Sequence, residues 1–160
     1  MKEPDHDPAP DGAVLSAALK AIRRLRQLTA RQTAERMNMS ARTYVRFESG
    51  ETKLNLDYIH RFARATESDP YAIIAAVTIA SPAFAMHSAD NQLAMILTVG
   101  LQDLARDLGP DVAALSARDV LEATGPMFQL LANTARAAAS RAEVDAGRTR
   151  LDAARPRPGR

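Results

Sequence analysis

The sequence predicts an all-α fold, on three observations. Apolar residues make up 46% of the 160 residues and aromatic residues only 4%, with alanine abundant, a composition that favours closely packed helices over a β-sandwich. Apolar residues recur at spacings of three and four, the period of an amphipathic helix. No alternating strand pattern is longer than a few residues. We therefore expect one domain, or one small domain with an appendage.

The first helix is expected over Ala13–Gln27, with an inner side formed by Leu15, Leu19, Ile22 and Leu25. The second spans Ala30–Arg36 and has Thr29 as its N-cap. Residues 37–39 then form a turn. Asn38 is suited to the tight corner because asparagine tolerates a positive φ better than other non-glycine residues.

The third helix begins after Ser40, a good N-cap, and ends at Gly50, which suits a left-handed C-terminal position. Its inner side carries residues spaced three and four apart, namely Tyr44, Phe47 and Glu48. The opposite side combines two arginines with small residues: Ala41, Arg42, Val45, Arg46 and Ser49. Small residues let the backbone approach a groove floor while guanidinium groups reach guanine edges or phosphates, so this face is suited to the DNA major groove.

Two more helices complete the expected domain. A loop over Glu51–Asn55 leads to a helix over Leu56–Ala65, with Ile59, Phe62 and Ala63 facing inward. Asp69-Pro70 starts a fifth helix, because proline fits the first helical position. The apolar run Tyr71–Met86 is shorter than the ~20 residues that a bilayer needs and is broken at Ser81-Pro82. It predicts a buried helix followed by a turn.

These residues resemble the helix-turn-helix of the phage repressor and Cro family, also called the XRE family, over roughly Leu15–Ala80. The matching residues lie in the second helix, the turn and the third helix: Ala34, Met39, Tyr44, Phe47 and the Glu48–Gly50 pair. The sequence departs from the family at Ala30, where glutamine is frequent, and at Asn38, where the turn commonly has glycine. The resemblance implies a five-helix DNA-binding domain over residues 13–80. Beyond it, the residue pattern predicts a helical C-terminal region.

Site residues follow from the outer face and from the resemblance. Four residues are expected to contact bases: Ala41, Arg42, Val45 and Arg46. Seven are expected to contact the DNA backbone: Thr29, Arg31, Ser40, Thr43, Ser49, Lys53 and Asn55. The alternative for each is an ordinary exposed residue. The resemblance also implies a structural ion pair between Arg23 and Glu48.

The C-terminal region, residues 81–147, has a helix capped by Ser88 or Asp90 and ending at Gly109-Pro110, with a leucine stripe: Leu93, Leu97, Leu101, Leu104 and Leu108. Ser116 caps a short helix, and Gly125-Pro126 begins a long one to about Ala146. Its apolar edge runs from Phe128 to Ala142. This region is either additional core or a dimer interface. We predict a dimer interface, because a single helix-turn-helix contacts too little DNA for high specificity.

Charge is distributed unevenly around a net value of +2. Residues 1–12, an acidic tail expected to be disordered, carry one basic and four acidic side chains. Residues 13–68 carry eleven basic and five acidic side chains, whereas residues 69–130 carry two and seven. Residues 131–160 carry seven basic and three acidic, and the stretch 148–160 is expected to be a basic disordered tail. Positive charge therefore concentrates on the segment whose pattern indicates DNA binding.

The predicted function is a dimeric, sequence-specific transcriptional regulator, a repressor that reads a pseudo-palindromic operator in double-stranded DNA. With no cysteine and an acidic N-terminus unlike a signal peptide, we expect a cytoplasmic, nucleoid-associated protein. The three histidines have no metal-site or triad spacing, so no catalysis, metal or cofactor is expected. Two alternatives stay open: an antitoxin or anti-activator whose C-terminal half binds a protein, and a small helical enzyme or ligand sensor.

Overall fold

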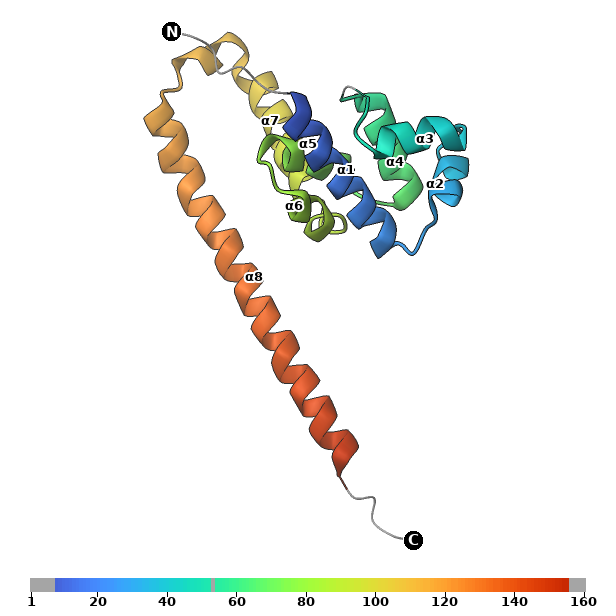
Figure 1. Ribbon diagram of the computed structural model, residues 1–160. Helices are drawn as coiled ribbons and strands as arrows, with labels where there is room; N and C mark the ends of the chain where they lie inside the picture. The colour runs from blue at the N-terminus through green and yellow to red at the C-terminus, as the bar shows by residue number, and fades with distance from the viewer. Residues whose placement is uncertain (1–7, 53, 156–160) are drawn as a thin grey trace. The chain divides into compact units, whose positions relative to one another are not determined.

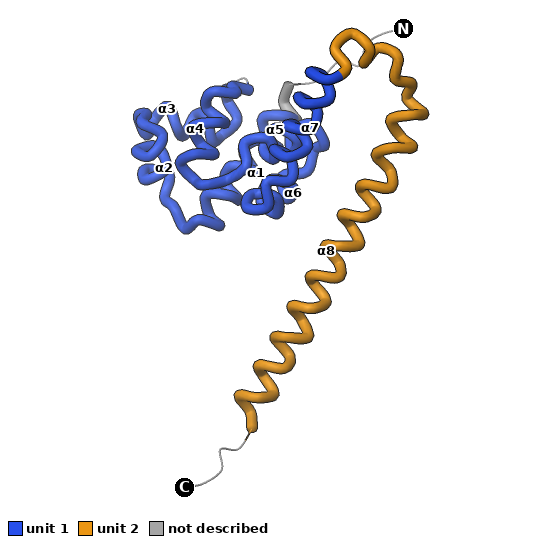
Figure 2. Tube along the Cα trace, turned by 180° about the vertical axis from the view of Figure 1, so that it is seen from behind, with its two compact units in different colours: residues 1–107 blue, residues 108–160 orange. Residues whose placement is uncertain are grey.

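The computed structural model of the chain describes residues 8–52 and 54–155, and over these residues the predicted all-α fold is confirmed (Figure 1). The described part contains eight α-helices and one 3-10 helix: α1 Pro8–Leu25, α2 Ala30–Arg36, α3 Ala41–Glu48, α4 Leu56–Thr66, α5 Pro70–Thr78, α6 Pro82–His87, α7 Leu93–Leu108, η1 Gly109–Ala114 and α8 Ala117–Ala154. The chain forms two compact units, the first ending at Asp107 and the second beginning at Leu108 (Figure 2).

Helix α1 runs through the middle of the first unit, with α2, α3 and α4 on one side and α5, α6 and α7 on the other (Figures 1 and 2). Its inner residues meet the apolar faces of α3, α4 and α5 in one core. The fully buried large side chains are Leu15, Leu19, Ile22, Tyr44, Phe47, Ile59, Phe62 and Ile73. The inward residues predicted for the first, third and fourth helices are thus buried, with the exception of Leu25.

Helix α1 differs from its predicted bounds at both ends. It begins at Pro8, inside the stretch 1–12 that was expected to be disordered, because proline is tolerated in a first helical turn and Asp11 there favours the helix dipole. It ends at Leu25, whose side chain is 47% exposed instead of facing the core. Gln27, just after this end, has a left-handed φ of +55°, which stops the helix. Residues 1–7 of the predicted tail lie outside the described residues.

Helix α6 was not predicted, and it lies directly after residue 80, where the helix-turn-helix domain was expected to end. Ser81-Pro82 starts a helix, as Asp69-Pro70 does for α5, although the apolar run was expected to end there in a turn. Helix α6 packs against α1 and α5, and Ala85 is fully buried in the core. The compact unit that contains the helix-turn-helix therefore continues beyond residue 80, to Asp107.

The start of α7 also differs from prediction, since neither Ser88 nor Asp90 caps it. Ser88 is buried at the end of α6, and Asp90 forms an ion pair with Arg26. Instead, the side chain of Asn91 accepts a hydrogen bond of 3.0 Å from the backbone N–H of Leu93. Tertiary contacts made after α6 thus decide which polar residue begins the helix.

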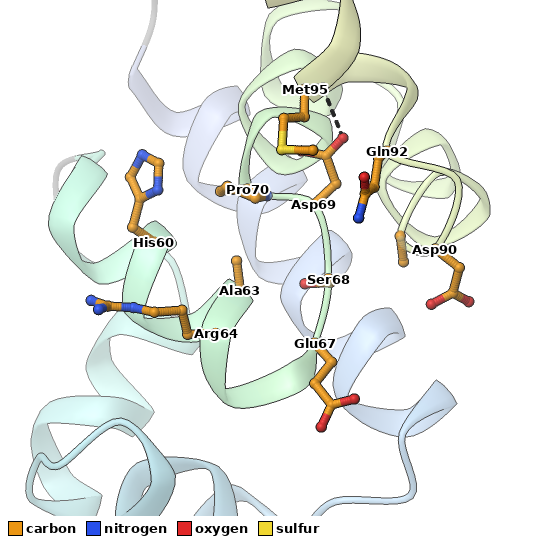
Figure 3. A pocket seen from close by; sticks show the side chains of 11 residues that line it. His60, Ala63, Arg64, Glu67, Ser68, Asp69, Pro70, Asp90, Gln92 and Met95 are labelled. Atoms are coloured by element: carbon orange, nitrogen blue, oxygen red, sulfur yellow. Dashed lines mark hydrogen bonds between the residues drawn. The ribbon is translucent and has the colours of Figure 1, made fainter. Parts of the chain in front are cut away.

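The buried side chain of Asp69 joins the N-termini of two helices that are distant in the sequence. One carboxylate oxygen accepts a hydrogen bond of 2.9 Å from the N–H of Tyr71 in α5, and the other accepts one of 2.9 Å from the N–H of Met95 in α7. Figure 3 shows the second bond as a dashed line. Helix N-termini favour negative charge, so this carboxylate stabilises both helices and fixes the start of α7.

Gly50 and Gly12 bring the end of α3 into direct backbone contact with the first part of α1. Gly50 has φ +77°, and a Cβ atom there would lie 2.1 Å from the carbonyl oxygen of Gly12. We expect Gly50→Ala to lower the free energy of unfolding by about 2 kcal/mol, because a left-handed residue with a Cβ is strained and overpacks this contact. Chemical denaturation followed by circular dichroism measures the loss.

Gly100→Ala is the matched control, because Gly100 lies inside α7 and a Cβ there meets nothing within 4 Å. Alanine is the better helix former, so this change should leave stability equal or higher by up to about 1 kcal/mol. Equal effects of the two substitutions would contradict the close approach of Gly12 and Gly50.

The second unit consists of η1 and the long helix α8. Ser116 caps α8, as the sequence predicted, and it forms a capping box with Asp119. The Gly125-Pro126 pair does not begin a new helix but lies inside α8, because proline removes one hydrogen bond while helix-forming residues continue on both sides. Helix α8 also continues to Ala154, into the stretch 148–160 that was expected to be disordered; residues 156–160 lie outside the described part.

Candidate nucleic-acid interface

Local hydrogen bonds set the corner between α2 and α3. Thr29 and Gln32 form a capping box at the start of α2, and Asn38 has φ +51°, the left-handed conformation that the sequence predicted for the turn. The N–H of Met39 then donates to the carbonyl of Ala34 at 3.0 Å, which closes α2. Ser40 caps α3 by accepting a hydrogen bond of 3.1 Å from the N–H of Thr43. The direction in which α3 leaves the turn is therefore fixed by backbone and cap geometry.

Two buried rings anchor α3 from behind. Tyr44 and Phe47 have no exposed surface. The ring of Phe47 meets those of Tyr58 and Phe62 edge to face, with centroids 5.5 and 6.4 Å apart. Such contacts stabilise beyond the burial of area alone, so a short helix is held rigidly on the core.

The opposite face of α3 is open to solvent. Ala41, Arg42, Val45 and Arg46 are all exposed, Val45 by 51%. Within the described residues Arg42 forms no ion pair, and Arg46 has only a long contact of 3.7 Å to the exposed carboxylate of Glu51. Both guanidinium groups are thus available to an external anion or base edge.

An ion pair connects α1 to the end of α3. Arg23 donates to the two carboxylate oxygens of Glu48 at 2.6 and 3.2 Å, and to the carbonyl of Leu28 at 3.0 Å. The hydroxyl of Tyr44 donates to the same carboxylate at 2.7 Å. The hydrogen bond to Glu48 raises the pKa of Arg23, and burial raises the pKa of Tyr44, so both groups keep their protons throughout the physiological range. The sequence-predicted partners are therefore brought together in a bidentate, partly buried pair.

The residues expected to contact the DNA backbone mostly cap helices in this structure. The side-chain oxygens of Thr29, Ser40 and Asn55 each accept a hydrogen bond from a backbone N–H at the start of a helix. The hydroxyl of Ser49 donates to the carbonyl of Arg46 at 3.0 Å. These hydrogen bonds place the four residues at the ends of α2, α3 and α4.

The remaining three expected backbone contacts differ from one another. Arg31 is exposed and pairs with Glu35 at 2.9 Å one turn along α2. Thr43 is half-buried, and its hydroxyl lies 2.8 Å from that of Ser40. Lys53 lies outside the described residues.

Three arginines that carried no sequence signal of their own hold the ends of helices. Arg26 donates to the carbonyls of Thr66 and Glu67 at the end of α4, at 2.8 and 2.9 Å. Arg36 donates to Ala65 at 3.2 Å, and Arg61 donates to the carbonyls of Met37 and Asn38 after α2. Cations are favourable at helix C-termini, so part of the positive charge of residues 13–68 stabilises the fold.

A cavity of about 710 Å³ lies in the first unit near the start of α5 and α7 (Figure 3). Charged side chains of both signs line it, namely Arg64, Glu67, Asp69 and Asp90, together with His60. Its buried carboxylate, Asp69, already caps two helices. No group of three or more side chains suited to a metal occurs among the described residues. The exposed basic side chains Arg42 and Arg46, of which only Arg46 has a weak ion pair within the described part, lie instead on α3.

The fold and this site define a DNA-binding domain of the helix-turn-helix class. Residues 14–71, from within α1 to the start of α5, match the family model described as a helix-turn-helix domain, which agrees with the resemblance to XRE-type regulators. The presence of this domain indicates a DNA-binding regulator. No curated protein and no solved structure matches the chain. No helix in the described residues has the length and apolar character to cross a membrane.

Proposed function

We propose that the protein is a dimeric, sequence-specific transcriptional regulator that represses genes by occupying their promoters. The observation that supports this most directly is the exposed pair Arg42 and Arg46 on a helix braced by buried rings and by the Arg23–Glu48 ion pair. An α-helix is about 10–12 Å wide and the major groove about 12 Å. Helix α3 therefore fits the groove without rearrangement.

The outer face of α3 offers two kinds of base contact. Arg42 and Arg46 are suited to bidentate hydrogen bonds with guanine, and Ala41 and Val45 to contact with a thymine methyl group. Phosphates on either side are contacted by residues at the helix ends and the following loop: Thr29, Arg31, Ser40, Thr43, Ser49, Lys53 and Asn55. These contacts fix the register of the protein and bring a salt dependence.

A second copy doubles the contacted DNA. Two copies related by a two-fold axis read inverted half-sites whose centres are about 34 Å apart, one turn of DNA, on the same face of the duplex. The protein acts on chromosomal DNA, at the nucleoid in the cytoplasm.

Selection of bound duplexes from a random DNA pool by the full-length protein tests the proposal. The enriched motif is expected to contain two inverted half-sites about 10 base pairs apart, with guanines at the positions that the arginines reach. Absence of any enriched motif contradicts sequence-specific binding. A single, non-inverted site contradicts the dimeric arrangement.

An antitoxin or anti-activator, with autoregulatory DNA binding, is the second candidate. Exposed apolar side chains on α7 favour it: Ile96, Val99, Leu101 and Leu104. Apolar patches of this kind are frequent at protein–protein interfaces. Copurification of a stoichiometric protein from the native host supports this function, and a motif located only in the promoter of the gene itself distinguishes it from a general repressor.

A further inference from the structure

Helix α8 carries an uncovered apolar stripe along one side. Seven residues alternate at spacings of three and four, and we call them the α8 seam: Leu121, Thr124, Phe128, Leu131, Ala135, Ala138 and Ala142. None of the residues of α8, which all lie in the described part, is buried, and Leu121 and Phe128 are 70% and 51% exposed. Long helices in water are stabilised mainly by packing an apolar face, so this stripe calls for a packing partner.

The spacing identifies the geometry of that partner. Alternating steps of three and four residues form the a and d positions of a heptad repeat, which keeps one stripe in contact with another helix along its length. Between residues 120 and 142 only Glu122, Arg136 and Arg141 are charged. At 3.6 residues per turn Glu122 and Arg136 lie roughly 100° around the helix from the seam, whereas Arg141 lies at its edge, about 60° from Ala138. The seam is therefore suited to a second helix of the same apolar character.

We propose that the α8 seam packs against the α8 seam of a second copy of this chain, with the two helices antiparallel. The inference rests on the dimeric regulator proposed above and names its interface. Side chains are large in the first half of the seam and small in the second. An antiparallel pair places Phe128 opposite Ala138 of the second copy and Leu131 opposite Ala135, so each large residue faces a small one.

A parallel pair fits these residues poorly. It places Phe128 on Phe128 and alanine on alanine, so no single distance between the helices suits both layers. It also brings together two copies of Asp145, the next d position of the repeat, whereas the antiparallel pair keeps the two apart and sets each Asp145 opposite Leu121 near an end of the contact. Residues 117–135 carry one basic and two acidic side chains, and residues 136–154 carry four and three. The antiparallel pair therefore also sets a negative half against a positive one.

The size of the contact is at the threshold for a specific dimer. In the proposed register residues 117–149 of the two helices overlap, a length of about 50 Å at 1.5 Å per residue. A strip about 10 Å wide along it covers about 500 Å² per copy, or about 1,000 Å² for the pair, which is about the least area expected of a biological interface.

Cysteine cross-linking tests the orientation cleanly, because the chain has no native cysteine. In the proposed register Ala132 faces its own copy near the two-fold axis, whereas Asn133 lies at the same level on the outer side of the helix. We expect full-length Ala132→Cys to form a disulfide-linked dimer on oxidation and Asn133→Cys not to. Ala142→Cys should cross-link with Thr124→Cys in a mixture but not with itself. Self-cross-linking of Ala142→Cys overturns the antiparallel arrangement.

A matched pair of substitutions tests the seam itself. Leu131 lies in the seam, and its neighbour Leu130, 67% exposed, lies on the other side of α8. We expect Leu131→Glu to raise the dimer dissociation constant on the order of 100-fold in sedimentation equilibrium, since an unpaired charge enters the interface twice. Leu130→Glu should change it by less than about threefold. Equal effects of the two, or a wild-type protein that is monomeric at every concentration, overturn the proposal.

The outcomes separate this inference from the proposed function. If the DNA selection yields an inverted motif while Ala132→Cys does not cross-link, the regulator stands and the seam is wrong. If Ala132→Cys cross-links while no DNA motif is enriched, the seam stands and the regulatory function is wrong.

Discussion

Replacing Glu48 by alanine is expected to lower the free energy of unfolding by about 3–5 kcal/mol, because the change leaves Arg23 as a partly buried charge without its partner. The same change removes the acceptor of the Tyr44 hydroxyl, which is fully buried with the ring. Two donors on different helices then lose one shared carboxylate. Urea denaturation at neutral pH, with circular dichroism as the signal, measures the loss.

Glu35→Ala is the matched control for this prediction. Glu35 also pairs with an arginine, Arg31, at 2.9 Å, but both side chains are largely exposed. Exposed pairs within a helix contribute about 0.3–0.5 kcal/mol, so Glu35→Ala should be nearly neutral. A Glu48→Ala variant as stable as Glu35→Ala would show that the link between α1 and α3 is dispensable for the fold.

The helix-turn-helix could be predicted from the sequence because its signals are local. The cap at Ser40, the left-handed Asn38 and the inward spacing of Tyr44 and Phe47 each act within one or two turns of helix. Burial of those two rings leaves the arginines on the outer face by geometry alone. The exposure of Arg42 and Arg46 therefore follows from the same short pattern.

The roles of the other arginines could not be predicted in this way. Arg26 and Arg61 bind carbonyl groups 23 to 41 residues away in the sequence. A charged residue on a helix gives no local sign of which helix end it will meet in the folded protein. Less of the positive charge of residues 13–68 is therefore available to DNA than the number of basic residues suggests.

Two predictions that rested on proline are wrong: the turn expected at Ser81-Pro82 and the helix start expected at Gly125-Pro126. The same residue type begins α6 at Pro82 and lies within α8 at Pro126. Proline fits a first helical turn without cost, whereas inside a helix it removes one hydrogen bond that a long run of helix formers tolerates. The difference lies in the residues before each proline, which are already helical before Pro126 but not before Pro82. The proline itself does not reveal this.

The double substitution Arg42→Ala with Arg46→Ala is expected to abolish specific binding, and each single substitution to weaken it about 10- to 100-fold. A bidentate arginine–guanine contact discriminates against the wrong base by about 1–3 kcal/mol, so two lost contacts remove most of the preference for the selected motif. Binding of the full-length protein to that motif and to a scrambled duplex, at one salt concentration, measures both affinity and preference. Folding should be unchanged, because both side chains are exposed.

Arg136→Ala removes the same charge from an exposed position on α8 that faces away from the α8 seam, and it should leave the preference for the motif intact. The salt dependence then separates the two ways in which α3 can use its arginines. An arginine that binds a phosphate contributes about 0.9 to the slope of log affinity against log salt, and its loss weakens all duplexes alike. An arginine that reads guanine changes the ratio of motif to scrambled affinity instead. Because the small neighbours Ala41 and Val45 let α3 lie deep in the groove, we expect the ratio to fall, and an unchanged ratio in both single variants would remove α3 as the reading element.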